Sequence, residues 1–404
     1  MSPSPALRCQ VLVVGAGPAG ADLARRLARS QVEVLLVDRL ADLRTGAFSS
    51  AALPWAALER LELPAEVVAS RWSHWQLFGP GDQRRHWASG GPLGVVLEFG
   101  ALRQWLAQEA GRWGSDLLLG ATAHRSEAAP EGMRTHLRLV GGRPIEVISD
   151  WVVDATGQER GLIGDPAPGP DPLVEGLGVE WLLELPLERW EPWADRLSFC
   201  LGSAWVPQGY GWVFPMQRGR LKVGVCRLLD PARPQPPLGA LLASLIERLG
   251  LGEHRVLDRH GGLIRSTIGR KEPHRRGRLI GLGDAISTAN LLGGEGIRHA
   301  MTSSQLLAPL LCQALRQPSL ADRLIGASYP RRLRQALGWR WGLSGRLARR
   351  TWLGLRGPQA DQRLDGLLRG LEHKKRAEDL SALLFDYRFE RYGLRALPDL
   401  LGWR

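Results

Sequence analysis

The clearest pattern of apolar positions lies near the start of the chain. Residues 11–14 form an uninterrupted run of Val and Leu, and residues 32–38 form a second, mostly apolar run that ends on Asp38. Runs of this kind are typical of strands buried on both faces of a parallel sheet. The segment from Pro18 to Ser30 between them has the pattern of a helix. The sequence therefore predicts a strand–helix–strand unit.

Similar patterns predict further elements along the chain. Buried strands are expected at Trp151–Asp154 and Leu279–Gly283, each running into a glycine turn. Residues 173–228 alternate in the manner of strands with one buried face. Apolar residues at helical spacing predict helices elsewhere. These helices are Ala51–Leu61 with Pro54 near its start, Leu97–Trp113, residues 238–250, Ile297 to about Leu315, and most of the chain beyond residue 331, with a break near Gly357-Pro358.

These elements predict an α/β fold with three parts. A discontinuous, Rossmann-like nucleotide-binding domain carries an inserted β-rich substrate domain, and a basic helical part follows at the C-terminal end. A proline-rich segment marks one crossing between the domains. The nucleotide-binding domain takes residues 1–65, 97–165 and 260–330, the substrate domain takes residues 66–96 and 166–259, and the helical part takes residues 331–404.

Positive charge is concentrated in the helical C-terminal part. The 404-residue chain has a formal net charge of +12, and residues 331–404 hold 17 Lys and Arg against 8 Asp and Glu. Such a surface suits an anionic membrane, an acidic partner or nucleic acid. No nucleic-acid-binding motif accompanies it, so we expect no nucleic acid and favour peripheral membrane contact or a partner protein, with a merely solvated surface as the alternative. Trp339, Trp341 and Trp352 lie among these arginines and could enter a headgroup layer.

Cysteine usage and hydropathy bear on location and metal binding. The four cysteines show no paired spacing, which favours reduced thiols and no metal site. The first ten residues lack the apolar core of a signal peptide. No apolar run reaches the roughly 18 residues that a membrane span needs. We therefore expect a cytoplasmic protein, peripheral to a membrane if the basic surface docks there.

Three glycines stand between the first strand and the first helix. Gly15, Gly17 and Gly20 have the G-x-G-x-x-G spacing. In such a turn the first glycine lets the chain reverse, the second lets the backbone approach a pyrophosphate, and the third lets the helix pack on the strand. Asp38, at the end of the second strand, can accept hydrogen bonds from ribose hydroxyls. The pattern predicts a dinucleotide site, and the alternative is a strand–helix–strand unit that merely packs.

Two later motifs point to a family. Residues 153–157 read Val-Asp-Ala-Thr-Gly, and Gly283-Asp284 is followed by Gly-Gly-Glu-Gly-Ile at residues 293–297. Together with the first glycine turn, they resemble the FAD-dependent oxidoreductases with the p-hydroxybenzoate hydroxylase fold, over about residues 10–315. Residues 209–215, which read Gly-Tyr-Gly-Trp-Val-Phe-Pro, are similar to a stretch of the geranylgeranyl reductase group within that family.

This resemblance implies FAD as the cofactor and assigns candidate contacts. Asp284 is expected near the ribityl and phosphate region, and the N–H groups of residues 294–297 near the pyrimidine edge of the flavin. A helix beginning there stabilises negative charge on the ring. Tyr210, Trp212 and Phe214 share one strand face and could line an apolar substrate pocket. The expected cofactor contacts are Gly15, Gly17, Pro18, Ala19, Gly20, Asp38, Arg39, Arg103, Gly157, Gly283, Asp284, Gly293, Gly294, Gly296 and Ile297, and the expected substrate contacts are Tyr210, Trp212, Phe214 and Pro215.

The chain departs from this family pattern in two places. The helix after the first excursion into the substrate domain lacks the family's Arg-x-x-Phe-Asp sequence, although Arg103 could supply a cation near the flavin. The loop at residues 45–50 contains no cysteine, so a protonation step that uses a thiol there is not expected. The nine histidines are scattered, and no catalytic residue is assigned.

The resemblance implies an FAD-dependent oxidoreductase that reduces C=C bonds of an isoprenoid or another apolar lipid. NAD(P)H or ferredoxin would supply the electrons. One alternative is a flavin monooxygenase or hydroxylase, which shares the fold and cofactor. Another is a flavoprotein without net redox turnover, such as a cyclase that resembles the lycopene cyclases. The sequence leaves these alternatives, the substrate and the oligomeric state open.

Overall fold

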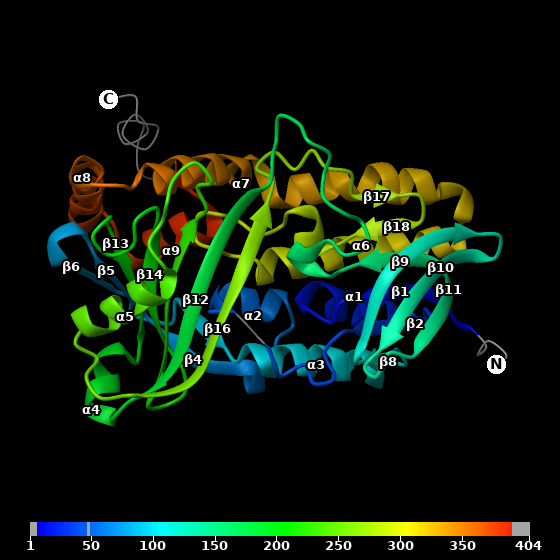
Figure 1. Cartoon of the computed structure of the whole chain (residues 1–404), viewed down its shortest axis with the longest axis horizontal. Coiled ribbons are helices and arrows are strands. Elements are labelled where there is room, and N and C mark those ends of the chain that lie inside the picture. Colours follow the sequence, from blue (N-terminus) through cyan, green and yellow to red (C-terminus); the bar gives the residue numbers. More distant parts are fainter. Residues whose placement is uncertain (1–5, 47–48, 390–404) are drawn as a thin grey trace.

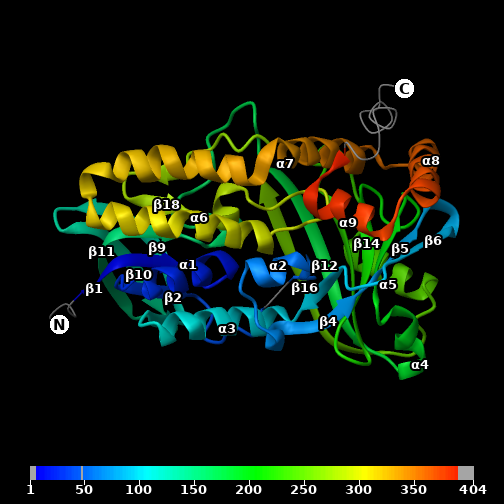
Figure 2. The same cartoon turned by 180° about the vertical axis from the view of Figure 1, so that it is seen from behind.

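The computed structural model describes residues 6–46 and 49–389, which form three sheets with surrounding helices (Figure 1, Figure 2). The eight strands of the first sheet are β1 (Leu7–Val14), β2 (Val34–Asp38), β8 (Asp116–Leu119), β9 (Ala121–Ala129), β10 (Gly132–Leu139), β11 (Pro144–Asp154), β17 (Arg275–Arg276) and β18 (Leu279–Gly281). Their order is β17-β18-β11-β1-β2-β8, and β10 and β9 follow on from β11. The pairs that β1 forms with β2 and β11, and those of β2 with β8 and β11 with β18, are parallel.

The carboxyl ends of three of these strands meet at one edge of the sheet. Val14 is the register partner of Val37 on one side and of Asp154 on the other, and Asp154 is the partner of Gly281. Ligands of open α/β sheets bind outside the carboxyl ends of the strands. The turns that follow β1, β11 and β18 therefore lie side by side at such an edge.

Three helices pack around this sheet. Helix α1 (Pro18–Arg29) contacts both α3 (Phe99–Arg112) and α6 (Ile297–Arg316). Asp22 of α1 accepts from Arg25 of the same helix at 2.6 Å and also from Ser304 of α6, so the carboxylate of this buried ion pair joins the two helices. A buried ion pair is tolerated only when further hydrogen bonds satisfy it. This cluster therefore holds α1 and α6 in register beneath the glycine turns.

A seven-stranded sheet forms the second layer, and its two faces have different covers. Helix α5 (Leu238–Arg248) packs on one face, against the cluster that includes Val213 and Val223. The other face presents Tyr210 and Phe214 to the C-terminal helices. The order is β16-β12-β15-β14-β13-β5-β6. The strands are β5 (His74–Phe78), β6 (Arg84–Ala88), β12 (Val174–Glu184), β13 (Arg196–Leu201), β14 (Gly209–Pro215), β15 (Arg220–Leu228) and β16 (Arg255–Ser266).

A small third sheet corrects one predicted helix. We expected a helix over Ala51–Leu61, but β3 (Ala52–Pro54) pairs with β7 (Gly94–Leu97), and only α2 (Ala56–Arg60) is helical. β4 (Val68–Trp72) lies on the other side of β7, which leaves β3 at an edge, where a proline is tolerated. The prediction was wrong because pairing with a strand some 40 residues away in sequence outweighs local helical spacing.

Three helices end the described chain. They are α7 (Tyr329–Gly354), α8 (Pro358–Lys374) and α9 (Ala377–Asp386), and the expected break near Gly357-Pro358 is present. In both views α7 runs from the neighbourhood of β18 toward α8 and the second sheet (Figure 1, Figure 2). Two shorter helical segments lie earlier in the chain. They are α4 (Leu187–Trp190) and a π-helical segment, Asp322–Ser328. Among the residues described, no helix is both long and apolar enough to cross a bilayer.

Two segments belong to other parts of the fold than the predicted domain boundaries gave them. β16 pairs with β12 along its whole length, so residues 260–266 belong to the second sheet and not to the nucleotide-binding domain. β4 joins the third sheet, although residues 66–96 were expected in the substrate domain. The C-terminal helices contribute Leu333, Trp341 and Trp352 to buried clusters. They are therefore part of the core rather than an appended surface.

Candidate functional site

The three adjacent turns are tied to one another through backbone hydrogen bonds. The amide of Gly15 donates to Val37 O, that of Ala155 to Val14 O, and that of Leu282 to Asp154 O. The fold thus brings together the first glycine turn, the Asp-Ala-Thr-Gly turn and the Gly283-Asp284 turn, which are more than 100 residues apart in sequence.

The first glycine turn has the geometry of a phosphate cradle. Gly15 has φ +107°, and a Cβ there would lie 2.3 Å from Ala155 O, while a Cβ at Gly20 would lie 1.9 Å from Gly15 O. Both positions therefore require glycine for close packing. Gly17 has no neighbour within 4 Å of its Cβ position, and no side chain caps α1. The free N–H groups at the start of α1, with open space before them, suit an anion.

Asp38 and Arg103 meet beside this cradle. Asp38 accepts from the amide of Ala16 at 2.7 Å and from that of Leu40 at 2.9 Å. Arg103, on α3, approaches Asp38 with 3.8 Å between Nη2 and Oδ2. Burial lowers the pKa of Arg103, and the neighbouring Asp38 carboxylate opposes this shift. A carboxylate has about four acceptor positions, so Asp38 keeps capacity for ribose hydroxyls; Arg39 beside it is exposed.

Asp154 fixes the turn after β11. Its carboxylate accepts from the amide and hydroxyl of Thr156 and from the amides of Leu162 and Ile163. Gly157 follows with φ +71° and open space at its Cβ position. The Asp154 carboxylate therefore fixes the conformation of the loop through these hydrogen bonds. The backbone of Gly157 remains accessible.

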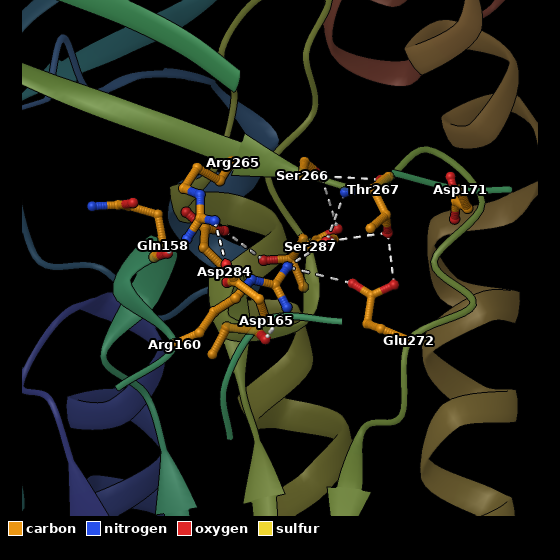
Figure 3. A network of polar contacts seen from close by, with 12 residues as sticks. Gln158, Arg160, Asp165, Asp171, Arg265, Ser266, Thr267, Glu272, Asp284 and Ser287 are labelled. Carbon is orange, nitrogen blue, oxygen red and sulfur yellow. Dashed lines mark hydrogen bonds and ion pairs between the residues drawn. The ribbon is translucent and has the colours of Figure 1, made fainter. Parts of the chain in front are cut away.

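A polar network that sequence reasoning missed lies behind this turn (Figure 3). Arg160 donates to Ala285 O and to Ser287 Oγ, and Ser287 also accepts from the amide of Thr267. Glu272 accepts from Thr267 Oγ1 at 2.6 Å and lies 3.5 Å from Arg160. Burial opposes ionisation of Glu272, but hydrogen bonds from Ser287 and Thr267 outweigh it and lower the pKa. Arg160 has a left-handed backbone conformation (φ +52°). Nothing in the sequence around Arg160 indicates that it is buried and donates to this network.

Asp284 lies at the centre of the assembled edge. Its Oδ1 accepts from Thr288 Oγ1 at 2.8 Å, and burial raises the pKa of the carboxyl. The preceding Gly283 has φ +63° and would place a Cβ 2.8 Å from the side chain of Ala19, in α1. Gly283 thus allows α1 and the Asp284 turn to touch.

The turn at residues 293–297 leads into α6, and the buried Glu295 side chain anchors it. Gly294 has φ +64°, Gly293 has open space at its Cβ position, and no side chain caps the helix at Gly296. Glu295 points inward, where it pairs with Arg298 (2.8 Å) and accepts from Tyr387 Oη (2.9 Å). These partners order the turn, and its Glu295 carbonyl also accepts from the amide of Asn290 at 2.8 Å.

Charge at Glu295 is strongly stabilised. Burial alone would favour the protonated acid, but Arg298 and His299 outweigh it and hold the pKa of Glu295 far below its usual value. Glu295 is therefore an ionised acceptor and not a proton donor at neutral pH. The same pairing raises the pKa of Arg298 above its ordinary value against the effect of burial.

An apolar pocket of about 790 Å³ extends from this turn. The second sheet supplies Tyr210 and Phe214 to its wall, as expected, together with residues of β5 and β13, and α7, α8 and α9 supply a large part of the remainder. Trp212 and Pro215 do not line the pocket. Trp212 donates from Nε1 to the buried Glu180 at 2.8 Å, and Pro215 O accepts from Ser70 at 2.7 Å. The lining from the C-terminal helices, which sequence reasoning missed, includes Leu347, Trp352, Leu364, Leu368, Leu380 and Phe385.

Tyr210 stands where the turn and the pocket meet. A Cβ at Gly294 would lie 3.3 Å from Tyr210 Oη, and the Trp352 ring centroid is 5.1 Å from that of Tyr210. Burial raises the pKa of Tyr210 well above its ordinary value, and burial raises that of the neighbouring Cys226 thiol to about 12. Both groups are therefore protonated at neutral pH.

Comparison with known proteins agrees with this architecture and with the predicted resemblance. A digeranylgeranylglycerophospholipid reductase of Haloferax volcanii is 27% identical over 76% of this chain and 76% of its own length. The crystal structure of a geranylgeranyl bacteriochlorophyll reductase-like protein from Thermoplasma acidophilum has a TM-score of 0.79 at 20% identity, covering 98% of this chain and all of that one. A myxobacterial chondrochloren halogenase, a variant of the FAD-dependent halogenases, has a TM-score of 0.67 at 17% identity over 98% of this chain and 97% of its own. The family model for lycopene cyclase proteins matches residues 10–341, and the chain belongs to that family.

Proposed function

We propose that this protein is an FAD-dependent oxidoreductase that reduces C=C bonds of an isoprenoid or another apolar lipid. The observation that carries the proposal is the apolar pocket, which begins at the Gly293–Ile297 turn and ends among the C-terminal helices. Its volume of about 790 Å³ falls in the range of roughly 300–1,000 Å³ of small-molecule sites. The reductase names of the relatives support a lipid as the occupant.

The residues at the sheet edge fit FAD. The open Gly17 turn and the uncapped start of α1 would hold the pyrophosphate, and Asp38 a ribose. Asp284 and the backbone of the Gly293–Ile297 turn would lie along the rest of the cofactor. Reduced FAD held by these residues would supply the hydride for the alkene. NAD(P)H or ferredoxin would be the source of those electrons.

The chain's own contribution is to orient the alkene and exclude water. Leucine and aromatic side chains surround the pocket on the side of the sheet and on the side of the helices, and such a lining holds a flexible apolar chain near one end of the cofactor site. Tyr210 Oη keeps its proton at neutral pH and faces both Gly294 and the pocket. Tyr210 is therefore the hydroxyl that we propose to position the reacting end of the substrate.

The test is a single anaerobic turnover measured by mass. The full chain is reconstituted with FAD, reduced by light or dithionite, and mixed with geranylgeranyl lipids. A gain of two mass units per double bond, with matching reoxidation of the flavin, supports the proposal. In a parallel run with oxygen admitted, a product sixteen mass units heavier would make the protein a monooxygenase. A protein that cannot bind FAD would contradict the proposal.

A cyclase is the second candidate, because the matching family model is that of the lycopene cyclase proteins. Cyclisation conserves the hydrogen count of the substrate. In the same experiment, a cyclase gives a product of unchanged mass with a new retention time and leaves the flavin reduced. One experiment thus separates the two candidates.

A peripheral membrane contact would deliver such a substrate, but the structure changes which residues can make it. Trp341 and Trp352 are buried and cannot enter a headgroup layer, so that part of the expectation was wrong. Trp339 on α7 is 67% exposed, and Arg340 lies over its ring at 5.4 Å. If α7 docks, Trp339→Ala weakens binding of the full chain to phosphatidylglycerol vesicles, whereas Trp113→Ala, at another exposed tryptophan, does not. Equal binding of both variants and the parent would exclude docking through Trp339.

A further inference from the structure

A second, basic pocket lies apart from the apolar one. It has a volume of about 550 Å³ and lies between the loop that follows β16 and the segment that leads into α7. No residue lines both pockets. Four cations and one acid take part in its lining, together with a histidine. They are Arg270, Lys271, Arg275, Arg334, Glu272 and His274.

Arg270 is buried in this pocket with donors to spare. It is 9% exposed, and within the described chain neither Nε nor Nη2 has a hydrogen-bond partner. Burial lowers the pKa of Arg270 to about 10, so the guanidinium is still charged at neutral pH. Its Cζ lies 5.4 Å from the ring centroid of Trp341, which contributes a cation–π contact. A buried guanidinium with unmet donors is costly unless a ligand satisfies it.

His274 is a second buried side chain in the lining of this pocket that lacks hydrogen-bond partners among the described residues. It is 6% exposed, and neither ring nitrogen has a hydrogen-bond partner among the described residues. Burial lowers the pKa of His274 to about 4, so the ring is neutral at pH 7 and keeps one N–H to donate. Two buried side chains with unmet donors therefore line one cavity.

The single acid of the pocket is already engaged elsewhere. Glu272 accepts from Thr267 Oγ1 and lies 3.5 Å from Arg160, in the network behind the cofactor turns (Figure 3), and its charge also acts on Arg270 and His274. Among the cations, Arg275 donates to Asp322 at 2.5 Å. Lys271 and Arg334 are exposed at the rim. The pocket therefore presents an excess of positive charge and of donors.

The loop that carries these groups is fixed before any ligand arrives. Asp171 Oδ1 accepts from the amides of Ile268 and Gly269 at 3.0 and 2.9 Å. On the other side, the amide of Gly281 donates to His274 O at 2.9 Å, which joins the loop to β18. Preorganised donors bind a ligand at a lower entropic cost than mobile ones.

We propose that this pocket binds a phosphate group, with the Arg270 guanidinium and a His274 N–H as buried donors and Lys271 and Arg334 as rim cations. The planar fork of an arginine matches two phosphate oxygens, and lysine adds a point charge. The phosphate belongs to free inorganic phosphate, to a nucleotide or to a lipid headgroup, and all three share this chemistry. The site does not depend on the proposed reductase activity.

The test is calorimetric titration of the FAD-reconstituted full chain at constant ionic strength and pH 7.5. Inorganic phosphate is expected to bind saturably at one site, and Arg270→Gln is expected to weaken it at least tenfold. The matched control is Arg143→Gln, which removes the same charge from an exposed turn at the far end of β11 and leaves binding unchanged. The double variant Lys271→Gln/Arg334→Gln alters only exposed side chains and is expected to weaken binding several-fold, so the proposal stays testable if the Arg270 variant does not fold.

Parallel titrations identify the source of the phosphate. Adenosine 2′,5′-bisphosphate binding more tightly than inorganic phosphate indicates a nucleotide, tighter binding of glycerol 1-phosphate indicates a headgroup, and equal binding of all three indicates the free ion. In each case, the binding must be weaker in Arg270→Gln or in Lys271→Gln/Arg334→Gln than in the parent. Absence of saturable phosphate binding, or binding that is equal in the folded variants and the parent, overturns the proposal.

Discussion

Replacing Glu295 by glutamine removes the carboxylate that joins the Gly293–Ile297 turn to Tyr387 and, through Arg298, to Phe385. Its oxygens pair with Arg298 and accept from Tyr387, and Arg298 also donates to Phe385 O. Arg298 is 7% exposed, so the variant leaves a buried charge whose remaining acidic partner among the described residues, Asp386, is 3.7 Å away. Breaking a buried pair costs about 3–5 kcal/mol. Because glutamine keeps one acceptor, we expect a loss of ~3 kcal/mol in the free energy of unfolding.

Two measurements check this expectation. Denaturant unfolding at pH 7 gives the loss of stability, with Glu253→Gln as a control at an exposed carboxylate that changes stability by less than ~0.5 kcal/mol. Hydrogen exchange reports on residues 377–386, which we expect to lose protection because Arg298, the donor to Phe385 O, loses the carboxylate that orients it. Unchanged stability together with unchanged protection of α9 would refute the reasoning.

The pH dependence supplies a third test with a definite sign. The folded-state pKa of Glu295 is depressed, so its stabilisation is complete above the unfolded pKa of about 4.3 and is lost as pH falls through the folded value. The gap between the parent and Glu295→Gln is therefore constant above about pH 5 and narrows in stronger acid. A gap that widens on acidification would contradict an ionised Glu295.

Three further outcomes follow from the structure. Gly17→Ala meets open space at φ −74°, so we expect unfolding of the apoprotein within about 1 kcal/mol of the parent but FAD affinity at least tenfold weaker, measured by flavin fluorescence. Leu364→Trp narrows the pocket from α8 and is expected to lower kcat/KM for the lipid about tenfold at unchanged FAD content. His274 has a folded pKa of about 4 against 6.5, so the unfolded chain binds its proton first, and stability falls by ~3 kcal/mol between pH 6.5 and 4. In urea unfolding, His274→Asn is expected to lose about 3 kcal/mol less stability than the parent over this pH range.

The nucleotide-binding turns could be predicted because their constraints are local. Gly15 and Gly20 leave no room for a Cβ, and the buried strand before them is a continuous apolar run. The order of three such turns along the chain then implied the parallel sheet that joins them. Asp38 and Arg103 were both expected near the cofactor, and the fold brings them within 3.8 Å.

The pocket could not be predicted in the same way, because distant segments build it. The face of α7, α8 and α9 that lines it has the apolar spacing of any amphipathic helix, and this spacing does not say which surface it meets. The pairing of Ala52–Pro54 with Gly94–Leu97 likewise depends on a strand far along the chain. Arg160 and Glu272 gave no signal, since charged residues in loops are usually solvated, whereas here both are buried.

Helix α7 changes how the basic end of the chain is understood. Near its start Arg334 lines the basic pocket, Trp341 lies beside Arg270, and Trp352 contacts Tyr210 at the apolar pocket. The eleven residues from Trp341 to Trp352 span about 16 Å of helix. Arg334 lies before a kink at Gly338, which has φ +72°, so the two segments of α7 together line both pockets. Deleting residues 331–404 would therefore open both sites and remove buried core, and a loss of membrane binding after such a truncation would not identify a docking surface. Point variants on the exposed side of α7 separate its cationic surface from its buried one.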